Sequence, residues 1–138
     1  MVRTTRIRVE THAPGDLHDL TPQVQEAVTA SGYRAGIATV FVAHTTAAVA
    51  ISEVEPGLRV DLPAMFERLV PADLPYRHNA LNYDDNAHSH LRTSLLGPSL
   101  TVPFDEGRLL LGTWQRIVLL EFDTHPRSRQ VVIQVLGA

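Results

Sequence analysis

The sequence predicts one α+β domain with a mostly antiparallel sheet and two or three short helices. Runs with the apolar or alternating character of strands outnumber the helical patterns, and four of them follow one another in the last third of the chain. Many strands with few helices are typical of α+β proteins. The 138 residues, 44% of them hydrophobic, make a chain of ordinary domain size without a repeat or linker. We therefore treat residues 1–138 as a single domain.

The elements of the first half follow from the local pattern. Residues 5–9 alternate between apolar side chains and arginines, as in a strand with one buried face. Thr21-Pro22 supplies an N-cap and a first helical residue, and Gly32 ends this helix. Residues 36–43 and 47–51 are nearly continuous apolar runs, which predict two buried strands.

The second half begins with an apolar stripe at helical spacing between Pro56 and Val70. Residues 71–85 are rich in Asp, Asn, His and Tyr and predict a loop, and residues 86–96 predict a short helix that Gly97 ends. Four strand candidates complete the chain, at residues 99–102, 108–111, 117–122 and 130–136.

The composition excludes several kinds of chemistry. Without Cys there is no thiolate nucleophile and no Cys-ligated zinc, and because all twelve basic residues are Arg there is no Schiff-base or P-loop lysine. A net charge of -3 argues against non-specific nucleic-acid binding. No apolar run approaches the ~20 residues of a membrane span, and the charged start has no apolar signal core. We expect a cytoplasmic protein that acts through His, Asp, Glu, Arg and hydroxyl groups.

Histidines occur where the predicted strands and helices end, which is where binding residues are favoured. His44 follows a buried strand, His78 lies in the polar loop, and His90 lies on the helix at residues 86–96. A single histidine after a strand is more often a hydrogen-bonded structural residue than a ligand, and this spacing is no metal signature by itself. From their placement we nevertheless predict that His44, His78 and His90 converge on one polar pocket.

The pair His88 and His90 resembles a metal motif, but helical geometry argues against it. Residues two apart on a helix point about 160° away from each other, so both cannot bind one ion. His90 shares its face with polar residues, whereas His88 points with Leu91 and Leu95. His90 is therefore the functional candidate, and His88 is assigned to packing or to the surface.

The charged candidates each have a second interpretation. Glu53 is a catalytic carboxylate or a solvated strand end, and Asp61 is a catalytic carboxylate or a helix-surface charge. Asp61 lies at the edge of the apolar stripe, where a half-buried carboxylate needs a partner. Arg108, and Arg127 and Arg129 beside Ser128, have guanidinium groups that suit phosphate, although each could also be a sheet-edge charge. Trp114 could equally be a hydrophobic anchor or a ligand contact.

The motifs in order resemble those of the YjbQ-type family, whose members are named secondary thiamine-phosphate synthases. The match runs from about Gly36 to Gly137 without a gap. The shared elements are His44-Thr45-Thr46-Ala47, Glu53, Asp61, Leu69-Val70-Pro71, Tyr76, His78, Asp85-Asn86-Ala87, His90-Leu91, Gly97-Pro98-Ser99, Val102-Pro103, Gly107-Arg108, Gly112-Thr113-Trp114-Gln115 and Glu121.

The resemblance implies a β-sandwich-like core and a homotrimer with sites near subunit boundaries. It also implies a divalent metal, zinc or magnesium, held by His44, His78 and His90. The implied catalytic residues are His44, Glu53, Asp61 and Arg108. The implied substrate-binding residues are Thr45, Thr46, Asn86, Gly112, Thr113, Trp114, Gln115 and Arg127.

Two departures from the family pattern lie near the expected site. Many relatives read Asp-Gly-Asn-Ala where this chain has Asp84-Asp85-Asn86-Ala87, and many read Asp-Gly-Pro-Arg where it has residues 123–127 as Asp-Thr-His-Pro-Arg. The second departure puts the substrate preference of this chain in question.

The activity implied by the resemblance couples an aminopyrimidine diphosphate to a thiazole phosphate and releases pyrophosphate. Catalysis of this reaction would be chiefly electrostatic, because the leaving group carries most of the charge. Two rival hypotheses stay open: a metal-dependent hydrolase of a small phosphorylated compound, and a non-catalytic trimer that binds a ligand or metal.

Overall fold

The computed structural model describes residues 1–12 and 14–138. Eight strands and four helices lie within this part of the chain. The strands are β1 (Val2–Glu10), β2 (Leu17–Asp19), β3 (Gly36–Val42), β4 (Ala47–Ser52), β5 (Ser99–Asp105), β6 (Arg108–Leu109), β7 (Arg116–Glu121) and β8 (Ser128–Gly137). The helices are α1 (Thr21–Ser31), α2 (Pro56–Leu69), α3 (Arg77–Asn82) and α4 (Ala87–Leu96).

The strands form two sheets, and the pairings within them are antiparallel. One sheet has the order β1-β8-β3-β5-β6 and the other has the order β2-β7-β4. The predicted α+β class with a mostly antiparallel, sandwich-like core is confirmed. β8 is the last strand of the chain, yet it lies between β1 and β3 in the larger sheet.

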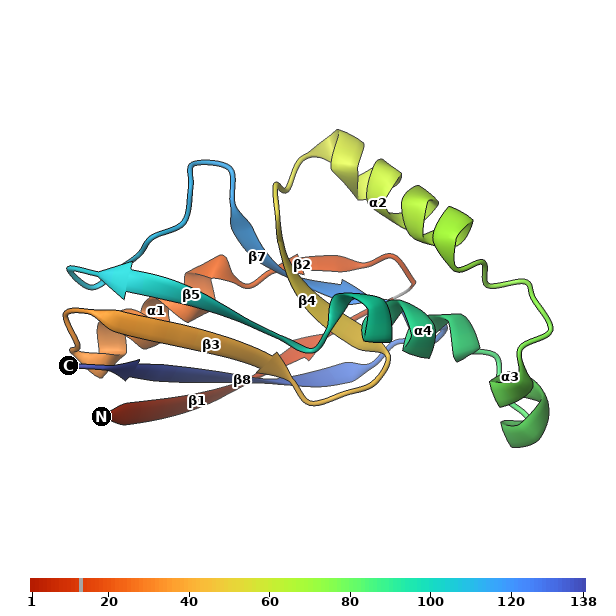
Figure 1. The fold of residues 1–138 in the computed structure, drawn as a ribbon, viewed down its shortest axis with the longest axis horizontal. Helices are drawn as coiled ribbons and strands as arrows, with labels where there is room; N and C mark the ends of the chain where they lie inside the picture. Colours follow the sequence, from red (N-terminus) through yellow and green to blue (C-terminus); the bar gives the residue numbers. More distant parts are fainter. Residues whose placement is uncertain (13) are drawn as a thin grey trace.

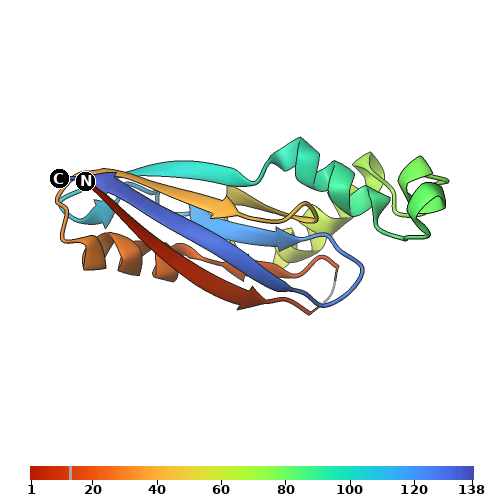
Figure 2. The same cartoon turned by 90° about the horizontal axis from the view of Figure 1, so that it is seen from below.

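The main core lies between the two sheets and α1, and it is made of short aliphatic side chains (Figures 1 and 2). A smaller apolar cluster lies on the other face of the small sheet, where Phe66 of α2 packs against Phe122 with ring centroids 4.9 Å apart. β7 is therefore covered on both faces, which explains its nearly continuous apolar sequence.

Three local predictions need correction. Thr21 does not cap α1: the N-cap is Leu20, and the Thr21 hydroxyl accepts the N–H of Ile117 at 2.8 Å instead. The polar segment 71–85, predicted to be a loop, contains α3. β2 has no counterpart in the sequence prediction, because only one of its three residues is apolar and its order comes from pairing with β7.

The helix at residues 86–96 is confirmed as α4, with Asn86 as N-cap and Gly97 as C-cap. None of the described helices is both long enough and apolar enough to span a membrane. α3 and α4 lie at one end of the molecule, and the two termini and the β5–β6 turn lie at the other (Figure 1).

Candidate functional site

Six of the residues predicted from the sequence line one recess of about 600 Å³ near α4. They are His44, Thr45, Thr46, Asn86, His90 and Arg127. Its remaining walls come from Ala43, Asp123, Ser128 and Arg129. Its volume is that of an ordinary small-molecule site. We call it the His44 recess.

The recess forms where three connections meet. The loop 43–46 follows β3, and the carbonyl of Thr46 accepts the N–H of Phe122 at 3.1 Å, which fixes this loop to the end of β7. The Ser89 hydroxyl of α4 donates to the carbonyl of Phe122. Strand ends and a helix N-terminus are thereby held together by backbone groups, so the side chains they carry converge.

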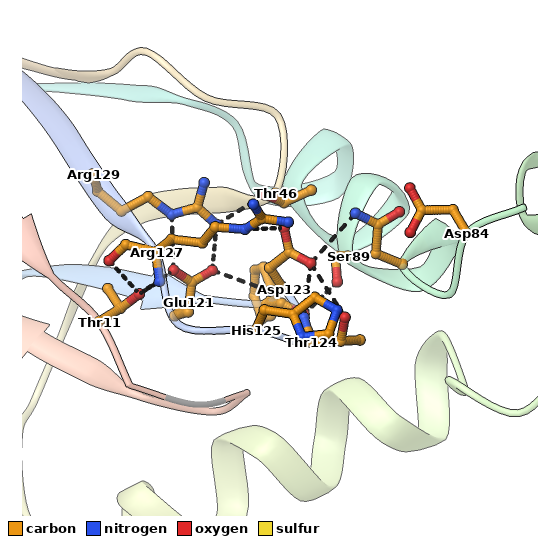
Figure 3. A network of polar contacts seen from close by, with 12 residues as sticks. Thr11, Thr46, Asp84, Ser89, Glu121, Asp123, Thr124, His125, Arg127 and Arg129 are labelled. Carbon is orange, nitrogen blue, oxygen red and sulfur yellow. Dashed lines mark hydrogen bonds and ion pairs between the residues drawn. The ribbon is translucent and has the colours of Figure 1, made fainter. Parts of the chain in front are cut away.

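A buried ion pair forms the floor of the recess (Figure 3). Arg129 of β8 binds Glu121 of β7 through two nitrogens, and its side chain is 3% exposed while that of Glu121 is fully buried. Arg129 also donates to the Thr46 hydroxyl at 2.8 Å, and the Thr11 hydroxyl donates to Glu121 at 2.6 Å. The pair is bidentate and its lone pairs are satisfied, so two buried charges are tolerated.

Asp123 accepts hydrogen bonds from several polar groups beside this ion pair. It accepts hydrogen bonds from Nε of Arg127 at 3.0 Å, from Nδ2 of Asn86 at 3.3 Å and from the N–H of Thr124 at 2.7 Å. Burial by itself would raise the pKa of Asp123, but these hydrogen bonds and the charge of Arg127 outweigh it and lower the pKa. Asp123 is therefore a carboxylate that holds its neighbours in place.

His78 is oriented through Asn86. Because the amide nitrogen of Asn86 donates to Asp123, its oxygen accepts from Nε2 of His78, 3.0 Å away. Nδ1 of His78 is then left without the proton in the neutral ring. The ring of His78 lies 4.6 Å from that of His90, centroid to centroid. The two imidazoles thus form a pair that could exchange a proton with a bound molecule.

His44 has a different role. Its Nε2 accepts the backbone N–H of Gln130 at 2.9 Å, so the neutral ring carries its proton on Nδ1. Burial, reinforced by the charges of Arg129 and Arg127, lowers the pKa of His44 below its ordinary value of 6.5. At neutral pH His44 is therefore an uncharged hydrogen-bond donor.

A metal held by His44, His78 and His90 stays a prediction. Within residues 1–12 and 14–138, no three His, Asp or Glu side chains of one chain lie close enough together to hold an ion. Nε2 of His44 is already an acceptor for Gln130, which disfavours this ring as a ligand. Among the described residues His78 and His90 lie side by side, with ring centroids 4.6 Å apart, and His44 is not a third member of that pair.

His88 packs inside the molecule, as the helical geometry allowed. It is 4% exposed, and burial together with the nearby Arg92 charge lowers its pKa below the ordinary value. The leucines expected on its face behave differently, since Leu91 is 46% exposed and Leu95 is 62% exposed. The buried face of α4 is the polar one. Its Ser89 hydroxyl donates to the Phe122 carbonyl, and its Arg92 donates to Glu67 and to the Val70 carbonyl.

Comparison with known proteins shows the family of this chain. Residues 5–138 match the family described as UPF0047 protein YjbQ-like. The chain belongs to this family. A UPF0047 protein of Methanothermobacter thermautotrophicus is 43% identical over 99% of this chain and 93% of its own length. One from Archaeoglobus fulgidus is 45% identical over 88% of this chain and 91% of its own.

Solved structures agree as well. A YbjQ-like protein of unknown function from Sulfolobus solfataricus aligns with a TM-score of 0.93 and 37% identity over 100% of this chain and 99% of its own. The YjbQ-like family is thus a family whose function is not established, and the family resemblance of the sequence is confirmed while its activity is not.

Eight predicted site residues of this YjbQ-like chain do not line the His44 recess of their own subunit: His78, Glu53, Asp61, Arg108 and residues 112–115. His78 lines a neighbouring recess together with His90. Glu53, at the end of β4, and Asp61, on α2, are exposed. Arg108 lines a recess with Tyr33 at the opposite end of the molecule. Residues 112–115 form the loop before β7, where Gly112 donates to the Gln115 side chain and Trp114 is 71% exposed.

The polar network beside the recess also contains Glu121 and Asp123, to which the sequence analysis assigned no role. It contains Arg129 as well, which is neither a sheet-edge charge nor a free anion binder but half of a buried ion pair with Glu121. The sequence contains a signal that one of them, Arg129, is buried. Arg129 precedes Val131, Ile133 and Val135 at spacings of two, so it lies on the buried face of β8. A charge at such a position needs a partner, which points to a buried carboxylate elsewhere.

Proposed function

We propose that this protein is a cytoplasmic transferase that binds phosphorylated small molecules in the His44 recess. The reaction we propose is the coupling of an aminopyrimidine diphosphate to a thiazole phosphate with release of pyrophosphate. The observation that carries the proposal is the set of free donors around one recess. The terminal nitrogens of Arg127 make no hydrogen bond within the described residues, and Nδ1–H of His44 is uncommitted.

The charge distribution supports an anionic ligand. Arg129 is neutralised by Glu121, and Arg127 is paired through Nε alone with Asp123. Arg127 is 44% exposed, so its fork remains accessible to a phosphate oxygen. His90 borders the same space, and the ring of His78 lies 4.6 Å from that of His90.

The proposed chemistry needs few groups. The thiazole nitrogen forms a bond to the pyrimidine methylene carbon while the bond from that carbon to the diphosphate oxygen breaks, and the electron pair leaves with the diphosphate. A hydrogen bond from His44 would stabilise the charge that develops on the diphosphate oxygens, and Arg127 would bind a phosphate group of the substrates. The His78–His90 pair would donate or accept a proton at the rim.

We also propose a homotrimer in which sites lie near subunit boundaries. Phe41, Leu136 and the α4 leucines are exposed apolar side chains, which association between copies could cover. A neighbouring copy could then supply Arg108 or Trp114 to the recess. Sedimentation should show a species of three 15.2 kDa chains, and a stable monomer at working concentration would contradict this.

The function is tested with untagged protein, both phosphorylated substrates and quantification of bound metal. We expect coupling in the wild type and a 10- to 100-fold lower rate in Arg127→Met, because one charge-assisted contact is lost. Arg68→Met removes a charge from exposed α2 and should change nothing. Metal-stimulated hydrolysis without coupling would favour the hydrolase, and binding without turnover would favour the non-catalytic module.

A further inference from the structure

A second recess adjoins the His44 recess on the outer face of the five-stranded sheet. It has a volume of about 490 Å³ and is lined by Arg6, Ile7, Arg8, His44, Ser128 and Gln130. His44 and Ser128 line both recesses, so the two share a wall. A molecule longer than one recess could therefore lie across His44.

Two arginines dominate the second recess. Arg6 and Arg8 are two residues apart on β1, so they lie on the same face, about 7 Å apart along the strand. Both are exposed, and neither makes a side-chain hydrogen bond or ion pair within residues 1–12 and 14–138. The next residue on this face is Glu10, whose carboxylate accepts from the Ser128 hydroxyl at 2.8 Å.

The register places hydrogen-bonding groups opposite these arginines. Arg8 pairs with Gln130 across the β1–β8 ladder. The backbone N–H of Gln130 fixes His44 with Nδ1–H free, as described above. Two cations, an imidazole N–H and a side-chain amide thus border one concave space. Charged side chains also protect an edge strand from pairing, but that role requires neither a concave surface nor the neighbouring histidine.

We propose that Arg6 and Arg8 form a second anion subsite, which takes the diphosphate of a substrate whose organic part extends past His44 into the first recess. This proposal rests on the proposed function and adds which arginines bind the diphosphate and which arginine binds the monophosphate. Two guanidinium forks match the several oxygens of a diphosphate, and Arg127 in the first recess is then left for the monophosphate of the second substrate.

The test is calorimetric binding of inorganic pyrophosphate at low salt. We expect the double variant Arg6→Gln/Arg8→Gln to weaken binding by roughly a hundredfold, since each charge-assisted contact contributes about tenfold. Arg3→Gln is the matched control: it removes the same charge from the opposite face of β1 and should change the affinity less than twofold. The KM of the aminopyrimidine diphosphate should rise in the double variant while that of the thiazole phosphate does not.

The outcomes separate the subsite from the proposed function. No pyrophosphate binding by the wild type, unchanged binding by the double variant, or equal weakening by Arg3→Gln would each overturn the subsite. If coupling persists in those cases and still depends on Arg127, the proposed function stands. If pyrophosphate binding depends on Arg6 and Arg8 but no coupling occurs, the subsite stands and the proposed reaction is wrong.

Discussion

Replacing Arg129 with methionine is expected to lower the free energy of unfolding by about 3–5 kcal/mol, a large part of the stability of an ordinary domain. The variant leaves the carboxylate of Glu121 fully buried without its bidentate partner. It also removes the donor to Thr46, which ties the loop 43–46 to β8. Urea denaturation at pH 7, with the midpoint and slope both fitted, measures the loss.

Two further variants make this measurement specific. Arg127→Met breaks an ion pair whose arginine is 44% exposed, so we expect about 1 kcal/mol or less. Glu121→Gln combined with Arg129→Met removes both buried charges and should be more stable than Arg129→Met alone. Equal losses for Arg127→Met and Arg129→Met would mean that the buried pair contributes no more to stability than the half-exposed pair of Arg127 and Asp123.

His90→Ala is expected to reduce turnover by a factor of about 1,000 while the protein stays folded. His90 lines the recess and stacks beside His78, and loss of a proton-transfer group has an effect of this size. The half-buried ring leaves no core cavity, so the thermal midpoint should change little. Rate and midpoint are measured on the same preparation.

His88→Ala should show the reverse pattern. Removing a side chain that is 4% exposed leaves a cavity beside Arg92, which we expect to cost about 2 kcal/mol of stability while turnover persists. A folded but inactive His88→Ala beside an active His90→Ala would show that the wrong histidine was assigned to the site.

The sequence predicted the part of the site that depends on where elements end. His44 lies just after an apolar run, and Asn86 begins a short helix, so their positions near a strand end and a helix N-terminus were readable. The choice of His90 over His88 needed only helical periodicity, and the burial of His88 agrees with it.

What the sequence could not predict depends on strand order and on packing between distant segments. Arg108 looked like a site residue, but β5 carries the chain away from α4, so the β6 arginine lies at the far end of its own subunit (Figure 1). The sequence also did not predict that the polar face of α4 is the buried one. Leu91 and Leu95 are exposed in the structure, although their spacing suggests an apolar face that packs against a core. The hydrogen bonds of Ser89 with Phe122 and of Arg92 with Val70 and Glu67 account for that orientation.

The position of β8 between β1 and β3 has a consequence for how the protein folds. In the described sheet β8 lies between β1 and β3, so β1 has no partner strand there until residues 128–137 have left the ribosome. Arg129 arrives with the same strand and completes the ion pair under the recess. Contacts such as Thr11 with Glu121 span 110 residues, and pairings this distant in sequence form slowly. Before β8 joins, the nascent chain therefore exposes unpaired strand edges. The ion pair beside the recess forms in the same step that completes the larger sheet.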